Sequence, residues 1–283
     1  ATDSLWPEGL GVQFENVELG IARTRAKYKE WPEVHEIRSL FQRQIREARR
    51  FIYAESQYFA SRAVAEAIIA RMQQPDPPEI VIVHPANADG WLEQQAMDHA
   101  RAELVRVIEE GDKTNSFSIW TPHIGETPIY VHAKLMVIDD AILRIGSANI
   151  NNRSMGLDSE CDVFIDSRRS GNEHAADQIA RLRYSLMAEH LGLDEEAIPS
   201  LLERYGSMRA LIENSGSPQG RHLRRYEPPE LTETERKLAE SAVLDPERPD
   251  DMFEPFAKGG LFRKGSQLAR VRDRLRRREG MDG

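Results

Sequence analysis

The chain has 283 residues, 40% of them hydrophobic, so it is long enough to bury one large or two small cores. The formal net charge is −9, from 38 Lys and Arg against 47 Asp and Glu. This balance argues against nucleic acid as the general partner, because duplex binding draws on basic side chains. The single cysteine, Cys161, excludes a disulfide within the chain, and no apolar run reaches the length of a membrane helix.

In chain order, apolar residues alternate with polar ones as in strands at some places and recur at helical spacing at others. The predicted strands are residues 16–24, 51–58, 80–84, 116–121, 130–138, 141–147 and 159–165. The predicted helices are residues 31–50, 60–73, 91–109, 173–190, 195–202 and 207–213. Strands that alternate with helices predict an α/β fold, with a mixed β-sheet covered by helices on both faces.

The pattern weakens after about residue 215, where prolines punctuate a highly charged stretch. These prolines are Pro218, Pro228, Pro229, Pro246, Pro249 and Pro255. We therefore divide the chain into a folded unit, residues 1–214, and a charged C-terminal extension, residues 215–283, which wraps the core in part or is partly mobile. The arginine-rich run at 270–278 is interpreted as a solvated helix end, the alternative being contact with anionic lipid or nucleic acid.

One block of the sequence carries a distinctive set of polar residues. His132, Lys134 and Asp139 read H-x-K-x-x-x-x-D, and the G-S-x-N string that follows contributes Ser147 and Asn149. The block places a nucleophilic base, a fixed cation and small hydrogen-bonding groups in two neighbouring strands. That combination suits attack on a phosphodiester.

The spacing predicts a hairpin, because the pair Asp139-Asp140 suits a tight turn between the runs 130–138 and 141–147. A loop of two or four residues pairs positions whose numbers sum to 279, which places His132 opposite Ser147. Alternation along each strand then gathers the side chains of His132, Lys134, Ser147 and Asn149 on one patch. A three-residue loop would break this alignment.

Asp139 is expected to behave differently from the other motif residues. It lies at the turn, at an odd offset from His132, so its side chain should point away from the patch. A carboxylate in the patch would also repel a phosphate. We group Asp139 with His132 and Lys134 as the catalytic motif, but interpret its role as structural and indirect.

The chemistry of these groups needs no metal. A neutral imidazole, with an ordinary pKa of about 6.5, can attack phosphorus and form a phosphohistidine that water or an alcohol then breaks. Lys134 would stabilise the charge that develops on the phosphoryl oxygens, while Ser147 and Asn149 bind the substrate through neutral hydrogen bonds. Glu160 would accept a hydrogen bond from the other imidazole nitrogen. No cluster has metal-ligand spacing, so we expect neither a metal nor another cofactor.

These residues resemble the signature of the phospholipase D superfamily, H-x-K-x4-D followed by G-S-x-N. The similarity extends to residues 52–59, which resemble the I-E-N-Q-Y-F segment in the second half of two-motif members, and through residues 151–162. It covers roughly residues 5–192. Glu160 stands where the family places the carboxylate that orients the catalytic histidine. The resemblance implies phosphodiester hydrolysis or phosphatidyl transfer through a covalent phosphohistidine, on a phospholipase D-like fold.

One departure from the family concerns the number of motifs. Family enzymes need two copies that face each other, and this chain carries one and begins at Ala1. It therefore resembles the C-terminal half of a two-motif protein, in which the C-terminal histidine usually serves as general acid and base. The unit at residues 1–214 would then be a catalytic half-domain. The alternative is a complete chain that dimerises so that two copies of His132 meet across a two-fold axis.

The leading hypothesis is one half of a phospholipase D-type enzyme that acts on phospholipids and needs a second motif copy for full activity. The alternatives are a homodimeric single-motif nuclease and an inactive half that serves only as a folded module. With a phospholipid substrate we expect peripheral membrane contact and a cytoplasmic or membrane-peripheral location.

Three further residues have open roles at the border of the predicted site. Gln57 is either a site residue or a structural amide, and His123 lies in a loop that leads into the motif strand. Trp91 either packs at a helix start, which we favour, or forms a rim for an acyl chain.

Overall fold

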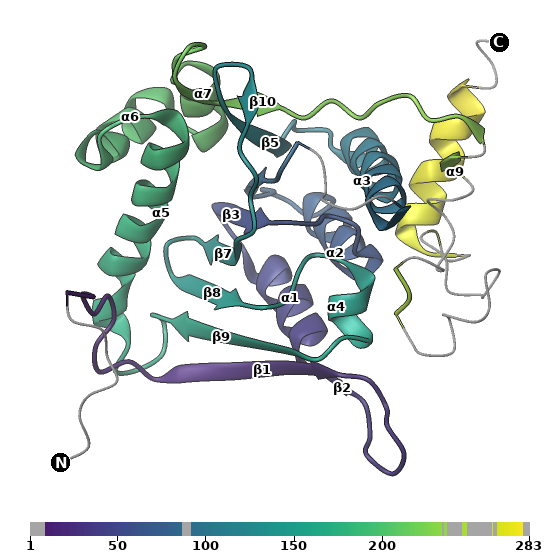
Figure 1. Cartoon of the computed structure of the whole chain (residues 1–283), viewed down its shortest axis with the longest axis horizontal. Helices are drawn as coiled ribbons and strands as arrows, with labels where there is room; N and C mark the ends of the chain where they lie inside the picture. Colours follow the sequence, from purple (N-terminus) through teal and green to yellow (C-terminus); the bar gives the residue numbers. More distant parts are fainter. Residues whose placement is uncertain are drawn as a thin grey trace.

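The computed structural model describes residues 9–86, 92–233, 235–236, 245–247, 262 and 265–279. Within these residues, ten strands form one sheet in the order β10-β5-β4-β3-β7-β8-β9-β1-β2, and β6 pairs with β5 (Figure 1). The strands are β1 Leu19–Arg25, β2 Val34–His35, β3 Phe51–Ser56, β4 Glu79–Val83, β5 Phe117–Ile124, β6 Thr127–Pro128, β7 Lys134–Ile138, β8 Ile142–Gly146, β9 Glu160–Asp166 and β10 Arg221–Arg225.

The sheet is mixed in direction. Strands β3, β4 and β5 run parallel, whereas β7, β8, β9 and β1 are joined as antiparallel neighbours, and β7 also runs antiparallel to β3. The helices are α1 Glu36–Glu47, α2 Arg62–Met72, α3 Leu92–Gly111, α4 Asn152–Gly156, α5 Ala176–Leu191, α6 Ile198–Tyr205, α7 Met208–Glu213 and α9 Gln267–Glu279. Two 3-10 turns, Glu173–Ala175 and Glu195–Ala197, precede α5 and α6.

Helices cover both faces of the sheet (Figure 1). Residues of α1, α2, α3 and α9 share one core with Ile52 and Ala54 of β3, while α5, α6 and α7 share the other core with Tyr53. Burial on both sides explains why β4 is almost wholly apolar. The predicted fold class, an α/β fold with a mixed sheet between helical layers, is confirmed.

The C-terminal extension takes part in this fold. Strand β10 pairs with β5 at one edge of the sheet, and α9 buries Leu268 and Val271 against α2 and α3. The arginines of α9 at 274 and 276–278 are exposed, as expected for a solvated helix end. Strand β10 was not predicted, because its sequence Arg-His-Leu-Arg-Arg has a single apolar residue, Leu223.

The hairpin of β7 and β8 differs from the prediction in its register. Ile138 pairs with Ile142, so paired positions sum to 280, and the predicted sum of 279 is wrong. Ala141 closes the turn by donating to the Ile138 carbonyl (2.9 Å), but its own carbonyl accepts from Ser167 (2.8 Å), so it does not join the β7–β8 ladder. The loop therefore has three residues, and the one-residue shift removes the predicted pairing of His132 with Ser147.

The two aspartates of this turn tie the sheet to both helical layers. Asp139 and Asp140 adopt left-handed φ values of 56° and 55°. The Asp139 carboxylate accepts from the backbone N–H groups at positions 49, 50 and 51 (2.7–2.9 Å), between α1 and β3. The Asp140 carboxylate binds the Arg183 guanidinium of α5 (2.7 and 2.8 Å).

Asp139→Ala should lower the free energy of unfolding by about 3 kcal/mol, because three backbone donors lose a charged acceptor. Denaturant unfolding measures the change. Asp194→Ala is a control, since the Asp194 side chain makes no capping hydrogen bond to the 3-10 turn after it. A loss no larger than that of the control would refute the anchoring role.

Candidate active site

His132 and Lys134 lie at the ends of central strands, where β7 and β9 begin and where β3 and β8 end. We call this group of strand ends the motif edge. Lys134 is the first residue of β7, and His132 precedes the strand instead of lying in it as predicted. The His132 side chain is exposed, and its ring stacks on Tyr130 with 6.3 Å between ring centroids. The imidazole is therefore open to a substrate or to a partner chain.

Lys134 is held by two oxygen atoms. Its Nζ donates to the His132 carbonyl (2.8 Å) and to Gln57 Oε1 (3.2 Å). Gln57 is itself fixed, because its Nε2 donates to the hydroxyl of Tyr130 (2.7 Å). Burial lowers the pKa of the Lys134 ammonium, and the nearby Glu160 carboxylate opposes this shift. Since an ammonium has three protons, one remains for a substrate oxygen.

Glu160 has different partners from the one expected. Its carboxylate accepts hydrogen bonds from the hydroxyls of Ser147 and Ser154, the latter at 2.7 Å. Among the described residues it makes no hydrogen bond with His132. The Ser147 hydroxyl also accepts from the Cys161 N–H (3.1 Å). Its one proton is used in the hydrogen bond to Glu160. In this arrangement Ser147 cannot also donate to a phosphate.

Ser154 lies in the segment 151–162, which resembles the family, but the sequence alone assigns it no role. Its hydroxyl accepts from the Asn149 N–H (3.1 Å) while donating to Glu160. Asn151 caps α4 and accepts from the Ser154 N–H (3.1 Å), which fixes the position of the serine. An asparagine N-cap followed by a serine is a signal that sequence alone could have supplied. The side-chain amide oxygen of Asn149, Oδ1, is buried without a hydrogen-bond partner among the described residues.

A buried ion pair supports the G-S-x-N segment from below. Arg144 and Asp162 pair with side-chain exposures of 1% and 0%, and the Asp162 carboxylate also accepts from the Ala148 N–H (3.1 Å). Arg144 lies over the Phe41 ring at 3.6 Å from its centroid. Gly146 pairs with Asp162 across β8 and β9, and a Cβ there would stand 2.6 Å from the Asp162 Cα. This position therefore requires glycine.

The remaining sequence candidates lie apart from these contacts. Asp139 is at the opposite end of β7, about 16 Å from Lys134 at strand spacing. His123 is buried near the end of β5, where it bonds the Thr121 carbonyl (3.0 Å) and stacks on His222. Trp91 lies outside the described residues.

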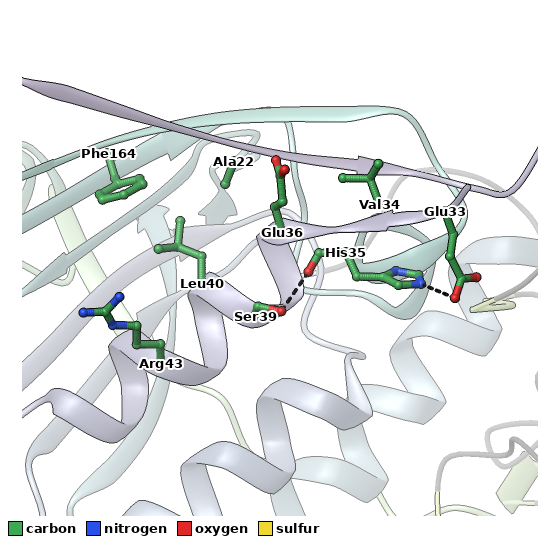
Figure 2. A pocket seen from close by; sticks show the side chains of 9 residues that line it. All are labelled: Ala22, Glu33, Val34, His35, Glu36, Ser39, Leu40, Arg43 and Phe164. Atoms are coloured by element: carbon green, nitrogen blue, oxygen red, sulfur yellow. Dashed lines mark hydrogen bonds and ion pairs between the residues drawn. The ribbon is translucent and has the colours of Figure 1, made fainter. Parts of the chain in front are cut away.

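A pocket of about 590 Å³ lies between β1, β2 and α1 (Figure 2). It contains no residue of either motif. His35 contacts Glu33 at 3.2 Å, and Glu36 pairs with Arg23 at 2.7 Å, so the polar groups of the pocket largely satisfy one another. Among the residues that the structure describes, no three His, Cys, Asp or Glu side chains are grouped to hold a metal ion.

Comparison of the sequence with known protein families identifies the class to which the chain belongs. The model of the family described as "Cardiolipin synthase, PLD-like domain" matches residues 41–182, half of the chain. The chain belongs to the phospholipase D superfamily, as its motifs predicted. The matched residues include all six that were assigned to the site from sequence.

Individual relatives match over parts of their length. Phospholipase D zeta 1 of Arabidopsis thaliana is 40% identical over 89 residues, which are 28% of this chain and 8% of that protein. Phospholipase D C of Dictyostelium discoideum is 29% identical over 197 residues, 56% of this chain and 12% of that protein. The chain thus spans about a tenth of the length of these relatives.

Solved structures that match include Nuc, a phospholipase D family member from Salmonella typhimurium, at 15% identity and a TM-score of 0.39 over 58% of this chain and 89% of that one. The phosphatidylserine synthase of Haemophilus influenzae Rd KW20 matches at 15% identity and a TM-score of 0.40, over 68% and 46% of the two chains. Within the described part of the chain, none of the helices has the length and apolar character to cross a membrane.

Gly146→Ala should lower the free energy of unfolding by about 2 kcal/mol or more, because the added methyl group meets the backbone of β9. Thermal unfolding measures the loss. Gly111→Ala is the matched control, since a Cβ at Gly111 has nothing within 4 Å. Equal stability of the two variants would contradict the close approach of β8 and β9.

Proposed function

We propose that this chain is one catalytic half of a phospholipase D-type phosphodiesterase that hydrolyses phospholipids or transfers their phosphatidyl group. The observation that carries the proposal is the Lys134 ammonium, held between the Gln57 amide and the His132 carbonyl beside an exposed imidazole. A fixed cation next to an exposed imidazole, which can give or accept a proton, suits phosphoryl transfer.

The proposed chemistry divides the work between two histidines. The histidine of the second half attacks phosphorus, and the bond from phosphorus to the leaving oxygen breaks as His132, protonated, gives its proton to that oxygen. Water or an alcohol then attacks the phosphorus and gives its proton to His132, while the phosphorus–nitrogen bond breaks and releases the histidine of the second half. The free proton of Lys134 bonds a phosphoryl oxygen and stabilises the charge that develops there. No step in this sequence calls on a metal.

Glu160 has a less direct role in this scheme. Its carboxylate holds Ser147 and Ser154 and lies close enough to Lys134 to oppose the fall in the lysine pKa. It therefore favours the charged form of the lysine and holds the G-S-x-N segment in place. Asn149 has a side-chain amide oxygen, without a partner among the described residues, that a proton-bearing substrate group could satisfy.

A partly exposed apolar row, which shares a pocket with residues 10–17, supports the need for a second half. Ile145, Val163 and Ile21 form a row across β8, β9 and β1, directly beside Gly146 at the motif edge. Ile21 and Ile145 are 62% and 42% exposed, although both are aliphatic. A second H-x-K half docked on this row would remove the row from water.

Mixing the chain with a separately produced half that carries its own H-x-K motif tests the proposal. Phosphodiesterase activity should appear in the mixture and fall about a thousandfold with His132→Asn, because proton transfer to the leaving oxygen is lost. His174→Asn, a change at an exposed histidine that bonds only the Glu15 carbonyl in the described chain, should keep full activity. Activity that survives His132→Asn would overturn the proposal.

A homodimeric nuclease is the second candidate, because the same apolar row could pack against its own copy around a two-fold axis. It requires a dimer in solution and cleavage of DNA in the presence of a chelator. Sedimentation that shows only monomer, together with no such cleavage, would remove it. An inactive folded module would instead show no activity, either mixed with the second half or as a dimer with its own copy.

Lys134→Ala should cut the turnover of the reconstituted enzyme by roughly 10²–10³, while the midpoint of thermal unfolding changes little, since the ammonium serves the transition state and not the core. Lys113→Ala, at an exposed lysine away from the motif edge, is the control. Unchanged turnover in Lys134→Ala would refute the assigned role.

A further inference from the structure

Residues 245–247 of the C-terminal extension lie against α4, which is more than ninety residues earlier in the sequence. The Asp245 carboxylate accepts from the N–H groups of Asn152 and Arg153, both at 2.8 Å. Each carboxylate oxygen therefore takes one of the backbone donors that open α4. A helix of five residues is too short to be stable by itself, and Asp245 supplies acceptors for its first N–H groups.

Glu247 adds a second anchor two residues further on. Its carboxylate pairs with Arg38 of α1 and with Arg62 of α2, the latter at 2.5 Å. Its side chain is 12% exposed, so water screens these pairs little. Glu247 also packs beside Gly156, the last residue of α4, where a Cβ would meet the Glu247 carbonyl oxygen. The segment 245–247 thus joins α1, α2 and α4.

The contacts of α4 lead directly to the motif edge. Ser154 of α4 donates to Glu160 (2.7 Å) and accepts from the Asn149 N–H (3.1 Å). Glu160 in turn holds Ser147 and acts on the charge of Lys134. Any displacement of α4 would therefore move the partner of Glu160 and the backbone of the G-S-x-N segment together.

We propose that Asp245 and Glu247 are positioning residues. The segment 245–247 is a strap that holds α4 so that Ser154 and Glu160 are aligned at the motif edge. The catalytic consequence rests on the proposed function, whereas the alignment of α4 is a property of the fold. The C-terminal extension thereby becomes part of the catalytic unit, although it lies beyond the residues that the family model matches.

The strap should respond to pH. Burial raises the pKa of Asp245 to about 7, while the N–H groups of Asn152 and Arg153 and the charge of Arg153 oppose the shift. Because the docked carboxyl binds its proton more tightly than a free one, docking is favoured at low pH and weakens as pH rises toward 7. The charged neighbours are Arg153, which also pairs with Asp158, and Glu247 with Arg38 and Arg62.

Amide hydrogen exchange on the full chain tests the strap without reference to activity. Asp245→Ala should raise exchange at Asn152, Arg153 and Asn149 by about tenfold or more and leave Arg49–Phe51 unchanged. Glu247→Gln should act in the same direction. The control is Glu235→Gln, a change in the same extension whose carboxylate accepts from Thr232. Wild-type protection at Asn152 should fall between about pH 4 and 7 and level off above pH 7, whereas that of Asp245→Asn should not change.

Activity of the reconstituted enzyme tests the catalytic consequence. Asp245→Ala and Glu247→Gln should lower kcat about tenfold and change KM less than about twofold, because they misalign the site without touching substrate. Unchanged exchange at Asn149 in both variants would overturn the strap. Raised exchange with unchanged kcat would overturn the positioning role. If the wild-type mixture is inactive, the proposed function fails, and exchange at Asn149 alone decides whether the strap stands.

Discussion

The buried ion pair of Arg144 and Asp162 is the interaction on which the position of the G-S-x-N segment depends. Removing both charges from water costs several kcal/mol, which is offset only where the geometry is good and further hydrogen bonds are made. Here Asp162 also binds the Ala148 N–H, and Arg144 lies on the Phe41 ring of α1. The pair thus fixes the segment after β8 to β9 and to the helical layer below, and Gly146 permits the close approach that it needs.

The H-x-K-x4-D motif corresponds to one short strand and its two ends. Lys134 opens β7 at the motif edge, while Asp139 follows its last residue and binds the backbone that opens β3. The fixed spacing of lysine and aspartate is therefore the length of β7. Asp139 contributes to the site by holding this strand against its neighbour, since it is too distant to touch a substrate bound at Lys134.

Sequence reasoning succeeded where the cause is local and failed where the cause is a contact distant in sequence. The apolar run at β4 and the spacing of Ile37, Phe41 and Ile45 in α1 predict their elements directly. The hairpin register depends instead on the Ala141 carbonyl, which bonds Ser167 beyond β9. The partners of Glu160 depend on α4, and α4 depends on Asp245, which is more than ninety residues away in sequence. Periodicity carries no signal of such contacts.

The exposed row of Ile145, Val163 and Ile21 has a consequence for the chain when it is alone. Hydrocarbon left in water on a sheet favours self-association, and the tendency grows with protein concentration. Synthesis together with the second half that we propose would cover the row during folding. The order in which the two halves are produced would then affect the yield of monodisperse protein, independently of any chemistry at His132.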